Sequence, residues 1–416
     1  MFKNFLSRFG AILCVVMSFS AMPAAAAQDN AGIDLDTVIA AALQAGPEAV
    51  LPEAARLEGE SSAYDAGTLP DLEIEMLTTI REEGSRETEI EVIQPLRVSD
   101  FGSRNYLARS IRNLADAESK AAALDLSQRV TRLYTEAWAY QQREKLYKNN
   151  LGYAAKALDS LQDAATVGRA DKAEADLFAA EVLRLTERQR IFQAAKRERL
   201  AEMSRISGMK YLAEAHLSSP SKASIPDNFE TVYALAESPA SLKNITQARL
   251  EMARRELDVV KADSVIGSFA PRLMAVRDHD EESTMTSAGI NISLPVWGSN
   301  RAEIYGAQAA RLQAEAAARA LDGGHYEDLI RQSHFKALQT FKTAQNYENE
   351  ILPAFRSVHK LSLTRFENGQ SSMLDLWTVR ERLIDVEQDY IEAVGAAIEA
   401  RLAIESLLGT TLEVQP

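Results

Sequence analysis

Apolar residues recur at helical spacing through most of this 416-residue chain. Val130, Leu133, Ala137 and Tyr140, for example, follow each other at intervals of three or four residues. The surrounding sequence is rich in alanine, leucine, glutamate, arginine and glutamine, which favour helices. The pattern predicts helices at about 34–66, 103–165, 171–207, 239–264, 299–364 and 371–408.

Two other regions show strict alternation of apolar and polar residues, which is typical of strands with one polar face. Leu72, Ile74 and Met76 alternate with acidic residues, and Ile290 and Ile292 alternate with small polar ones. We expect strands at about 71–79, 88–96, 272–278 and 286–296, forming hairpins at 71–96 and 272–296.

The chain repeats itself at an interval of about 200 residues, and such repeats define an architecture. Four short signals keep this register: Leu69-Pro70-Asp71-Leu72 with Ala270-Pro271-Arg272-Leu273, Gln94-Pro95-Leu96 with Leu294-Pro295-Val296, Val167-Gly168 with Asn368-Gly369, and Ile206-Ser207-Gly208 with Leu407-Leu408-Gly409. Each half has a helix, a β-hairpin and a long helix pair (103–207 and 299–408). We divide the chain into repeats at 28–209 and 239–409, a connector with little regular structure at 210–238, and a tail at 410–416.

The predicted lengths define the fold class. A helix of about 60 residues is ~90 Å long, so it must pack lengthwise against equally long partners. Four strands are too few to close a membrane barrel, which needs about eight. Three copies would supply twelve strands. We therefore expect long coiled-coil helices plus a membrane β-barrel, built on an internal two-fold repeat and closed by several copies of the chain; the resemblance described below implies a homotrimer.

Residues 1–27 have the pattern of a secretory signal peptide. Lys3 and Arg8 precede an apolar stretch at 9–19, and Ala25-Ala26-Ala27 forms a small-residue cleavage site. No later window approaches 18 apolar residues. Cys14 is the only cysteine and lies inside this segment, where it is either a plain signal residue or a lipid-attachment site.

The balance of charge and chemistry excludes several function classes. The chain has a formal net charge of −14, and removing two basic signal residues makes it about −16, which argues against nucleic acid as a partner. The five histidines are scattered, with no pair at i, i+4, and no glycine-rich phosphate loop or nucleophile motif occurs. We therefore predict no catalytic residues, no cofactor and no metal centre.

The motifs of the second half resemble the TolC-like family of outer-membrane efflux proteins. The passage Ile292-Ser293-Leu294-Pro295-Val296-Trp297-Gly298 with Asn300-Arg301 is similar to the family's strand-to-helix segment. Ile351-Leu352-Pro353, Phe366-Glu367-Asn368-Gly369 and Met373-Leu374-Asp375-Leu376 are similar to its helix-hairpin signature, and 402–409 to its terminal helix. The family forms trimers with a twelve-strand barrel in the outer-membrane lipid and a twelve-helix periplasmic tunnel.

The resemblance implies a passive conduit that docks a periplasmic adaptor and an inner-membrane pump. A pump of the resistance-nodulation-division type, exporting metal cations or drugs, fits the organisation best, and a channel for type I protein secretion is the alternative. A soluble periplasmic coiled-coil scaffold or adaptor would also carry a signal and long helices, but it lacks paired barrel hairpins.

The two helix-hairpin turns are the expected adaptor-docking tips, because the family exposes them at the end of the tube. They comprise Val167, Gly168, Arg169, Asn368, Gly369 and Gln370. Glycine there also supplies the backbone freedom that reversing a helix requires. Asp375 matches a family gate position, and Glu174 and Asp176 hold the equivalent places in the first repeat. Acids in the first turn of a helix are equally explained by the helix dipole.

Acidic residues also mark the expected barrel. Glu73, Glu75, Glu89 and Glu91 share the polar face of the first hairpin, so in a lipid-embedded barrel they line the lumen and favour cations. On a soluble protein they are a plain water-facing surface. The loop at 278–282 is either a solvated turn or a metal-binding mouth. Pro353, and Gly152 at the equivalent place, are expected to bend the long helices.

Overall fold

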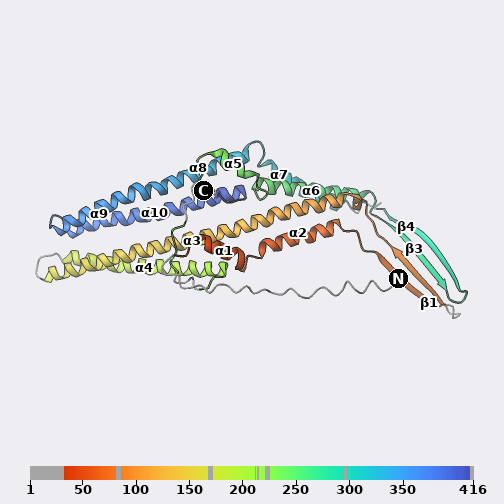
Figure 1. The fold of residues 1–416 in the computed structure, drawn as a ribbon, viewed down its shortest axis with the longest axis horizontal. Coiled ribbons are helices and arrows are strands. Elements are labelled where there is room, and N and C mark those ends of the chain that lie inside the picture. The colour runs from red at the N-terminus through yellow and green to blue at the C-terminus, as the bar shows by residue number, and fades with distance from the viewer. Residues whose placement is uncertain are drawn as a thin grey trace.

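The protein is elongated, with a sheet at one end and two helical hairpins reaching to the other (Figure 1). The computed structural model describes residues 32–80, 86–166, 172–210, 212, 215–220, 225–294, 298 and 300–412. Within these ranges no helix has the combined length and apolarity that crossing a bilayer requires. The expected signal segment at 1–27 lies outside the described residues.

The elements follow the two halves of the chain. The first half contains α1 (Leu35–Ala45), α2 (Leu51–Gly67), β1 (Glu73–Ile80), β2 (Arg86–Ile93), the 3-10 turn η1 (Val98–Phe101), α3 (Ser103–Thr166) and α4 (Lys172–Ser207). The second half contains α5 (Phe229–Ala234), the 3-10 turn η3 (Leu235–Glu237), α6 (Leu242–Val265), β3 (Ser268–Asp278), β4 (Ser283–Ser293), α7 (Arg301–Arg319), α8 (His325–Asn346), the π-helical turn η4 (Tyr347–Ile351), α9 (Leu352–Glu367) and α10 (Met373–Leu408).

The sheet joins both repeats in the order β1-β2-β3-β4, with every neighbouring pair antiparallel. In the register, Glu75 lies opposite Glu91 and Glu91 lies opposite Met274. Among the described strands, β1 pairs only with β2 and β4 only with β3. The outer edges of β1 and β4 therefore carry backbone groups that no described strand satisfies.

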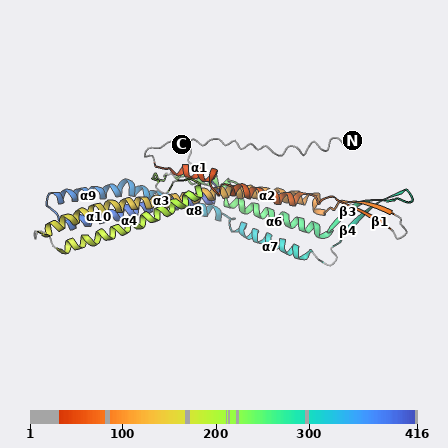
Figure 2. The same ribbon diagram turned by 90° about the horizontal axis from the view of Figure 1, so that it is seen from below.

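The helices pack lengthwise, as their length requires. Helix α3 contacts α4 toward the hairpin tips and α2 and α6 toward the sheet, and α7 lies against α6 (Figure 2). Near the far tips, the Phe178 and Trp377 rings meet edge to face with centroids 5.3 Å apart, which holds α4 against α10. Such a contact adds about 0.5–1.5 kcal/mol to the area that the rings bury.

A core at mid-length holds the hairpins, α1, Leu212 and Leu217 together. Val38 and Ala42 of α1 pack with Tyr134 of α3 and Met203 of α4, and all four are fully buried. The Tyr134 hydroxyl lies 2.7 Å from the carbonyl oxygen of Ile33 and 2.9 Å from that of Ser218. Burial raises the pKa of Tyr134 far above its ordinary value, so this hydroxyl stays a hydrogen-bond donor.

The structure corrects the expected single helix at 299–364. The chain leaves α7 after Arg319 and begins α8 at His325, because Gly323 and Gly324 adopt positive φ angles of 65° and 90°. The expected helix at 34–66 is likewise two helices, separated at Gly46, where a Cβ would come within 2.3 Å of the Ile206 carbonyl oxygen. The connector at 210–238, expected to be irregular, contains α5 and η3.

The strands and the bend also differ in detail. Strand β2 ends at Ile93, three residues before the expected position 96, and β3 and β4 begin four and three residues earlier than expected. At Pro353 the helix is accommodated by the π-helical turn η4, whose wider hydrogen-bonding pattern makes room for the proline ring. By contrast, α3 continues through Gly152 without interruption, so the expected weak point there is not seen.

Candidate functional site

The four acids singled out in the first hairpin share one face of the sheet. Residues that lie opposite each other on antiparallel strands, and alternate residues along one strand, point to the same side. Glu75 lies opposite Glu91 and Leu77 opposite Glu89, while Glu73 is two positions from Glu75. The face therefore presents a concentrated negative charge.

One cation from the second repeat partly offsets this charge. Arg272 lies diagonally across from Glu91, with Nη1 3.3 Å from Oε1. Its side chain lies over Gly289, where an added Cβ would come within 3.1 Å of Nε, so the glycine makes room for the arginine. Glu73, Glu75 and Glu89 make no ion pair within the described part of the chain.

The opposite face of the sheet is apolar and open to solvent in the single chain. Its large apolar side chains have exposed fractions of 40–67%. They are Ile74, Met76, Ile80, Ile90, Leu273, Ile290 and Ile292. An apolar face of this size on a soluble surface would be a liability, so it indicates contact with lipid or with another molecule.

The tip of the second hairpin shows a turn in which polar groups bond to one another. The Asp278 Oδ1 accepts the backbone N–H of Asp280 at 2.9 Å and that of Glu281 at 3.2 Å. His279 Nε2 lies 3.0 Å from the Thr88 hydroxyl of the first hairpin. No group of three or more metal-binding side chains occurs among the residues the structure describes.

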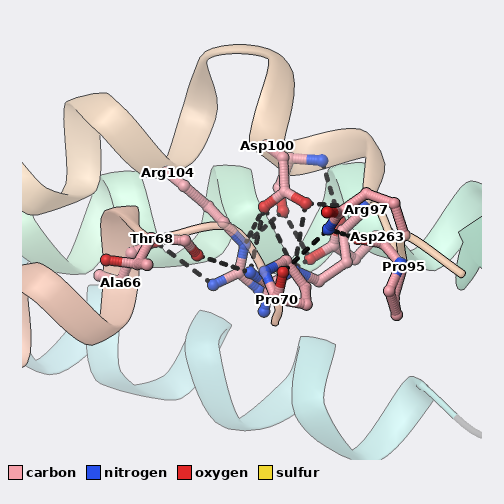
Figure 3. Close-up of polar contacts among 10 residues, drawn as sticks. Ala66, Thr68, Pro70, Pro95, Arg97, Asp100, Arg104 and Asp263 are labelled. Atoms are coloured by element: carbon pink, nitrogen blue, oxygen red, sulfur yellow. Dashed lines mark hydrogen bonds and ion pairs between the residues drawn. The ribbon is translucent and has the colours of Figure 1, made fainter. Parts of the chain in front are cut away.

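A polar network, which the sequence patterns did not indicate, connects the sheet to the helices (Figure 3). Asp100, whose side chain is only 2% exposed, accepts the backbone N–H of Arg97 at 2.7 Å and pairs with Arg104 at 3.3 Å. Arg104 reaches Asp263 of α6 with Nη2 at 3.2 Å, and Asp263 also accepts from Ser99. We call these residues, 97–104 with Asp263, the first junction. It ties both repeats together where strands become helices.

The expected gate residues stand at the starts of the hairpin helices α4 and α10. Asp375 is the third residue of α10 and its Oδ2 accepts the Ser372 hydroxyl at 2.7 Å and the Ser372 N–H at 3.1 Å. These bonds, the side-chain one first, hold the pKa of Asp375 below its usual value. Glu174 lies in the first turn of α4, followed by Asp176. The Phe178–Trp377 contact brings the starts of the two helices side by side.

The described hairpin turn is exposed and closed by its own backbone. Gly369 has a positive φ of 71°, its N–H donates to the Phe366 carbonyl at 2.9 Å, and the Gln370 N–H donates to that of Arg365 at 2.8 Å. Asn368 is exposed beside them. This is the glycine-dependent way of ending a helix. The equivalent first turn, with Val167, Gly168 and Arg169, lies outside the described residues.

A cavity of about 640 Å³ lies between α3, α9 and α10, and sequence reasoning missed it because its walls come from distant segments. Arg380 lies with Cζ 3.6 Å from the centre of the Tyr153 ring, and its Nη1 is 3.1 Å from His359 Nε2. Arginine can only donate, so His359 must accept through an unprotonated Nε2. Burial, and then the charge of Arg380, lower the pKa of His359.

This geometry predicts a pH-dependent contact between α9 and α10. Because the folded pKa of His359 lies below 6.5, the unfolded chain binds more protons just below that pH. Stability is therefore full above pH ~6.5 and falls as the pH drops toward the folded pKa. Tyr153 and Lys145 of α3, Arg356 of α9, and Glu387 of α10 also face the cavity. Hydrogen exchange of α9 and α10 between pH 8 and 5.5 measures the effect.

His359→Gln keeps a hydrogen-bond acceptor but cannot titrate, so it is the matched control. We expect the acid-induced rise in exchange to be strongly reduced in that variant. An equal rise in both proteins would assign the pH response to other groups.

Taken together, the long packed helices and the sheet with one acidic and one apolar face are similar to those of the TolC-like outer-membrane channels. Residues 234–410 match the family model described as outer membrane efflux protein. A relative from Cupriavidus metallidurans, described as the cobalt-zinc-cadmium resistance protein CzcC, is 23% identical over 359 residues, which cover 84% of each chain.

Solved structures share the whole fold. The outer membrane protein VceC of Vibrio cholerae superposes with a TM-score of 0.73 at 15% identity, covering 91% of this chain and 97% of that one. The CmeC outer membrane channel of Campylobacter jejuni gives a TM-score of 0.73 at 11% identity, covering 93% and 90%. These matches confirm the resemblance to the TolC-like family and the predicted combination of long helices with a four-stranded antiparallel sheet.

Proposed function

We propose that this protein is the outer-membrane channel of a tripartite efflux system. It acts as a homotrimeric passive conduit, with its sheet in the outer membrane and its helices forming a tunnel in the periplasm. In this account three copies contribute twelve strands, and a periplasmic adaptor joins the tunnel to an inner-membrane pump. The work of export is done by the pump, so the channel itself needs no catalytic group.

The observation that carries this proposal is the four-stranded sheet. It has one exposed apolar face, one acidic face and two edges that no described strand covers. Open edges and an apolar face are both costly in water, and closing several sheets into a barrel within lipid removes both costs. A soluble scaffold gives no reason for either feature.

Membrane extraction tests the proposal against the scaffold alternative. We expect the protein to stay in outer-membrane fractions through carbonate and salt washes, to need detergent for release, and then to have the mass of a trimer. Release by carbonate as a monomer would contradict the channel and favour the scaffold.

The cargo that the acidic face fits best is cationic. Twelve glutamates would line the lumen of a trimer, since each chain contributes Glu73, Glu75, Glu89 and Glu91. Rings of acids favour cations in channels, and the relative from Cupriavidus metallidurans is described as a cobalt-zinc-cadmium resistance protein. A deletion strain that tolerates cobalt, zinc and cadmium like its parent would remove divalent metals as cargo.

We assign adaptor docking to the hairpin tips. The exposed turn at Asn368, Gly369 and Gln370 supports this role, and we extend it by the internal repeat to Val167, Gly168 and Arg169. Arg169→Glu is expected to reduce export severalfold without lowering the amount of trimer, because a reversed charge repels the acceptor that the arginine meets. Gln370→Glu, which adds an acid to the tip of the second helix hairpin, serves as the comparison variant. Full export by Arg169→Glu would remove Arg169 from the docking surface.

We propose that Asp375 lines the narrow end of the tunnel, with Glu174 and Asp176 near it. Three copies of an acid at the start of α10 would repel one another and attract cations. Asp375→Ala is therefore expected to raise the conductance of the reconstituted channel. Because Asp375 also closes the α10 capping box, Ser372→Ala is the control, since it removes the cap and keeps the carboxylate. An equal rise in both variants would show loosening of the helix and not a gate.

A further inference from the structure

The first junction is complete within one chain because α3 lies between α2 and α6. Arg104, the second residue of α3, follows Gly102-Ser103 and places its guanidinium between the ends of these two helices. Its Nη1 lies 3.4 Å from the Ala66 carbonyl oxygen of α2, and its Nη2 lies 3.2 Å from the Asp263 carboxylate of α6. The arginine thus joins its own repeat to the next one.

The second repeat has a similar helix start but only half of these contacts. Arg301, the first residue of α7, comes three positions after Gly298, whereas Arg104 comes two positions after Gly102. Its neighbour Asn300 donates to the Asp263 carbonyl oxygen at 3.3 Å, which is the contact to its own repeat. Arg301 itself is exposed, and no carboxylate pairs with it in the described part of the chain.

The spacing explains why the chain cannot complete this second junction alone. Nine positions separate Pro95 from Arg104, but only six separate Pro295 from Arg301. Positions 295–300 contain no acidic residue that could take the part of Asp100, which pairs with Arg104 in the first repeat. An acid for Arg301 would then come from a helix that lies beside α7 in an assembly of several copies.

In a closed ring that repeats the order α2, α3, α6, α7, the helix next to α7 is α2 of another copy, and α2 carries an acid near its end. Asp263 stands two residues before the end of α6, and Asp65 stands two residues before the end of α2. Asp65 is exposed and has no ion pair among the described residues. Beside it Tyr64 is 62% exposed, with Arg112 Cζ 5.6 Å from the centre of its ring, and Tyr305 of α7 is 66% exposed.

We propose that Arg301 of one copy pairs with Asp65 of the partner subunit, forming a second junction between chains that repeats the first one within a chain. The occupant of the α7 face is therefore a second copy of this protein. The proposal rests on the trimeric assembly and adds to it the residues that fix how neighbouring copies meet.

Cross-linking between differently tagged chains tests this contact. One chain carries Asp65→Cys and the other Arg301→Cys, both in a Cys14→Ser background so that no other thiol exists. Because an arginine–aspartate pair spans more than the roughly 7 Å that a disulfide allows between Cα atoms, a short bis-maleimide is used. We expect most of the mixed assemblies to give a product with both tags. Asp65→Cys with Arg319→Cys, at the far end of α7, is the control and should give little.

The outcomes separate this contact from the assembly as a whole. A detergent-extracted trimer without the two-tag product, or with as much product from the Arg319→Cys control, would overturn the Asp65–Arg301 contact and leave the channel standing. A monomer would overturn both.

Charge exchange is a second test of the pair. The single variants Asp65→Arg and Arg301→Asp should each lower the trimer yield severalfold, and the double variant should regain most of the lost yield. No recovery in the double variant would contradict the pair.

Discussion

Gly409→Ala is expected to abolish accumulation of the folded protein. Gly409 ends α10 in a left-handed conformation with φ of 66°, and a Cβ there would lie 2.1 Å from the Ala240 carbonyl carbon and 2.3 Å from the Ser241 nitrogen. Both are backbone atoms at the start of α6, so no side chain can move aside. Strain of this kind, added to the cost of the left-handed conformation, exceeds the margin of a marginally stable fold.

The matched control is Gly152→Ala. Gly152 is exposed within α3, and a Cβ there meets nothing within 4 Å. Alanine favours a helix interior over glycine by about 0.5–1 kcal/mol, so this variant should be unchanged or slightly more stable. For both variants, we would measure the trimer yield in membranes and the melting temperature of the purified protein. Wild-type yield for Gly409→Ala would show that the end of α10 is not packed against α6 as described.

Asp100→Ala is expected to cause the second largest loss. The Asp100 carboxylate is buried, and removing it leaves the backbone N–H of Arg97 without its acceptor and leaves Arg104 with Asp263 as its remaining carboxylate. Leaving a buried polar group without its partner costs about 1–3 kcal/mol. The melting temperature should fall by several degrees, and the sheet end should become more susceptible to proteolysis than the hairpin tips.

Two further variants make this test specific. Asp100→Asn keeps an acceptor for the Arg97 N–H but loses the charge, so it should lie between Asp100→Ala and wild type. Glu187→Ala breaks an exposed pair with Arg190 on α4 and should leave the melting temperature unchanged. If Asp100→Ala melts like Glu187→Ala, the first junction does not stabilise the connection of sheet and helices.

Much of the fold follows from local signals in the sequence. Alternation placed the four strands and put Glu73, Glu75, Glu89 and Glu91 on one face, and the register of β1 and β2 agrees. The repeat of glycine and proline signals placed the helix ends. The break at Gly323 was not predicted, although two adjacent glycines follow Asp322. The alanine-rich sequence of α7 favoured a continuous helix there.

The rest depends on contacts that no local pattern contains. Asp263 is 159 positions from Arg104, and Arg380 is 21 positions from His359, so neither pair shows in hydrophobic periodicity. The role of Asp375 as a capping residue was readable from Ser372 three positions before it. Whether that carboxylate also narrows a tunnel depends on other copies of the chain, and a single sequence does not contain their arrangement.

Single-channel recording in a planar bilayer decides whether the protein forms a channel that prefers cations. The purified trimer is expected to give small, discrete conductance steps with a preference for cations. A variant with glutamine at positions 73, 75, 89 and 91 should conduct with that preference largely lost, because the charge lining the lumen is gone. A trimer that forms no conducting unit, or an ion preference unaltered by the four glutamines, would contradict the account.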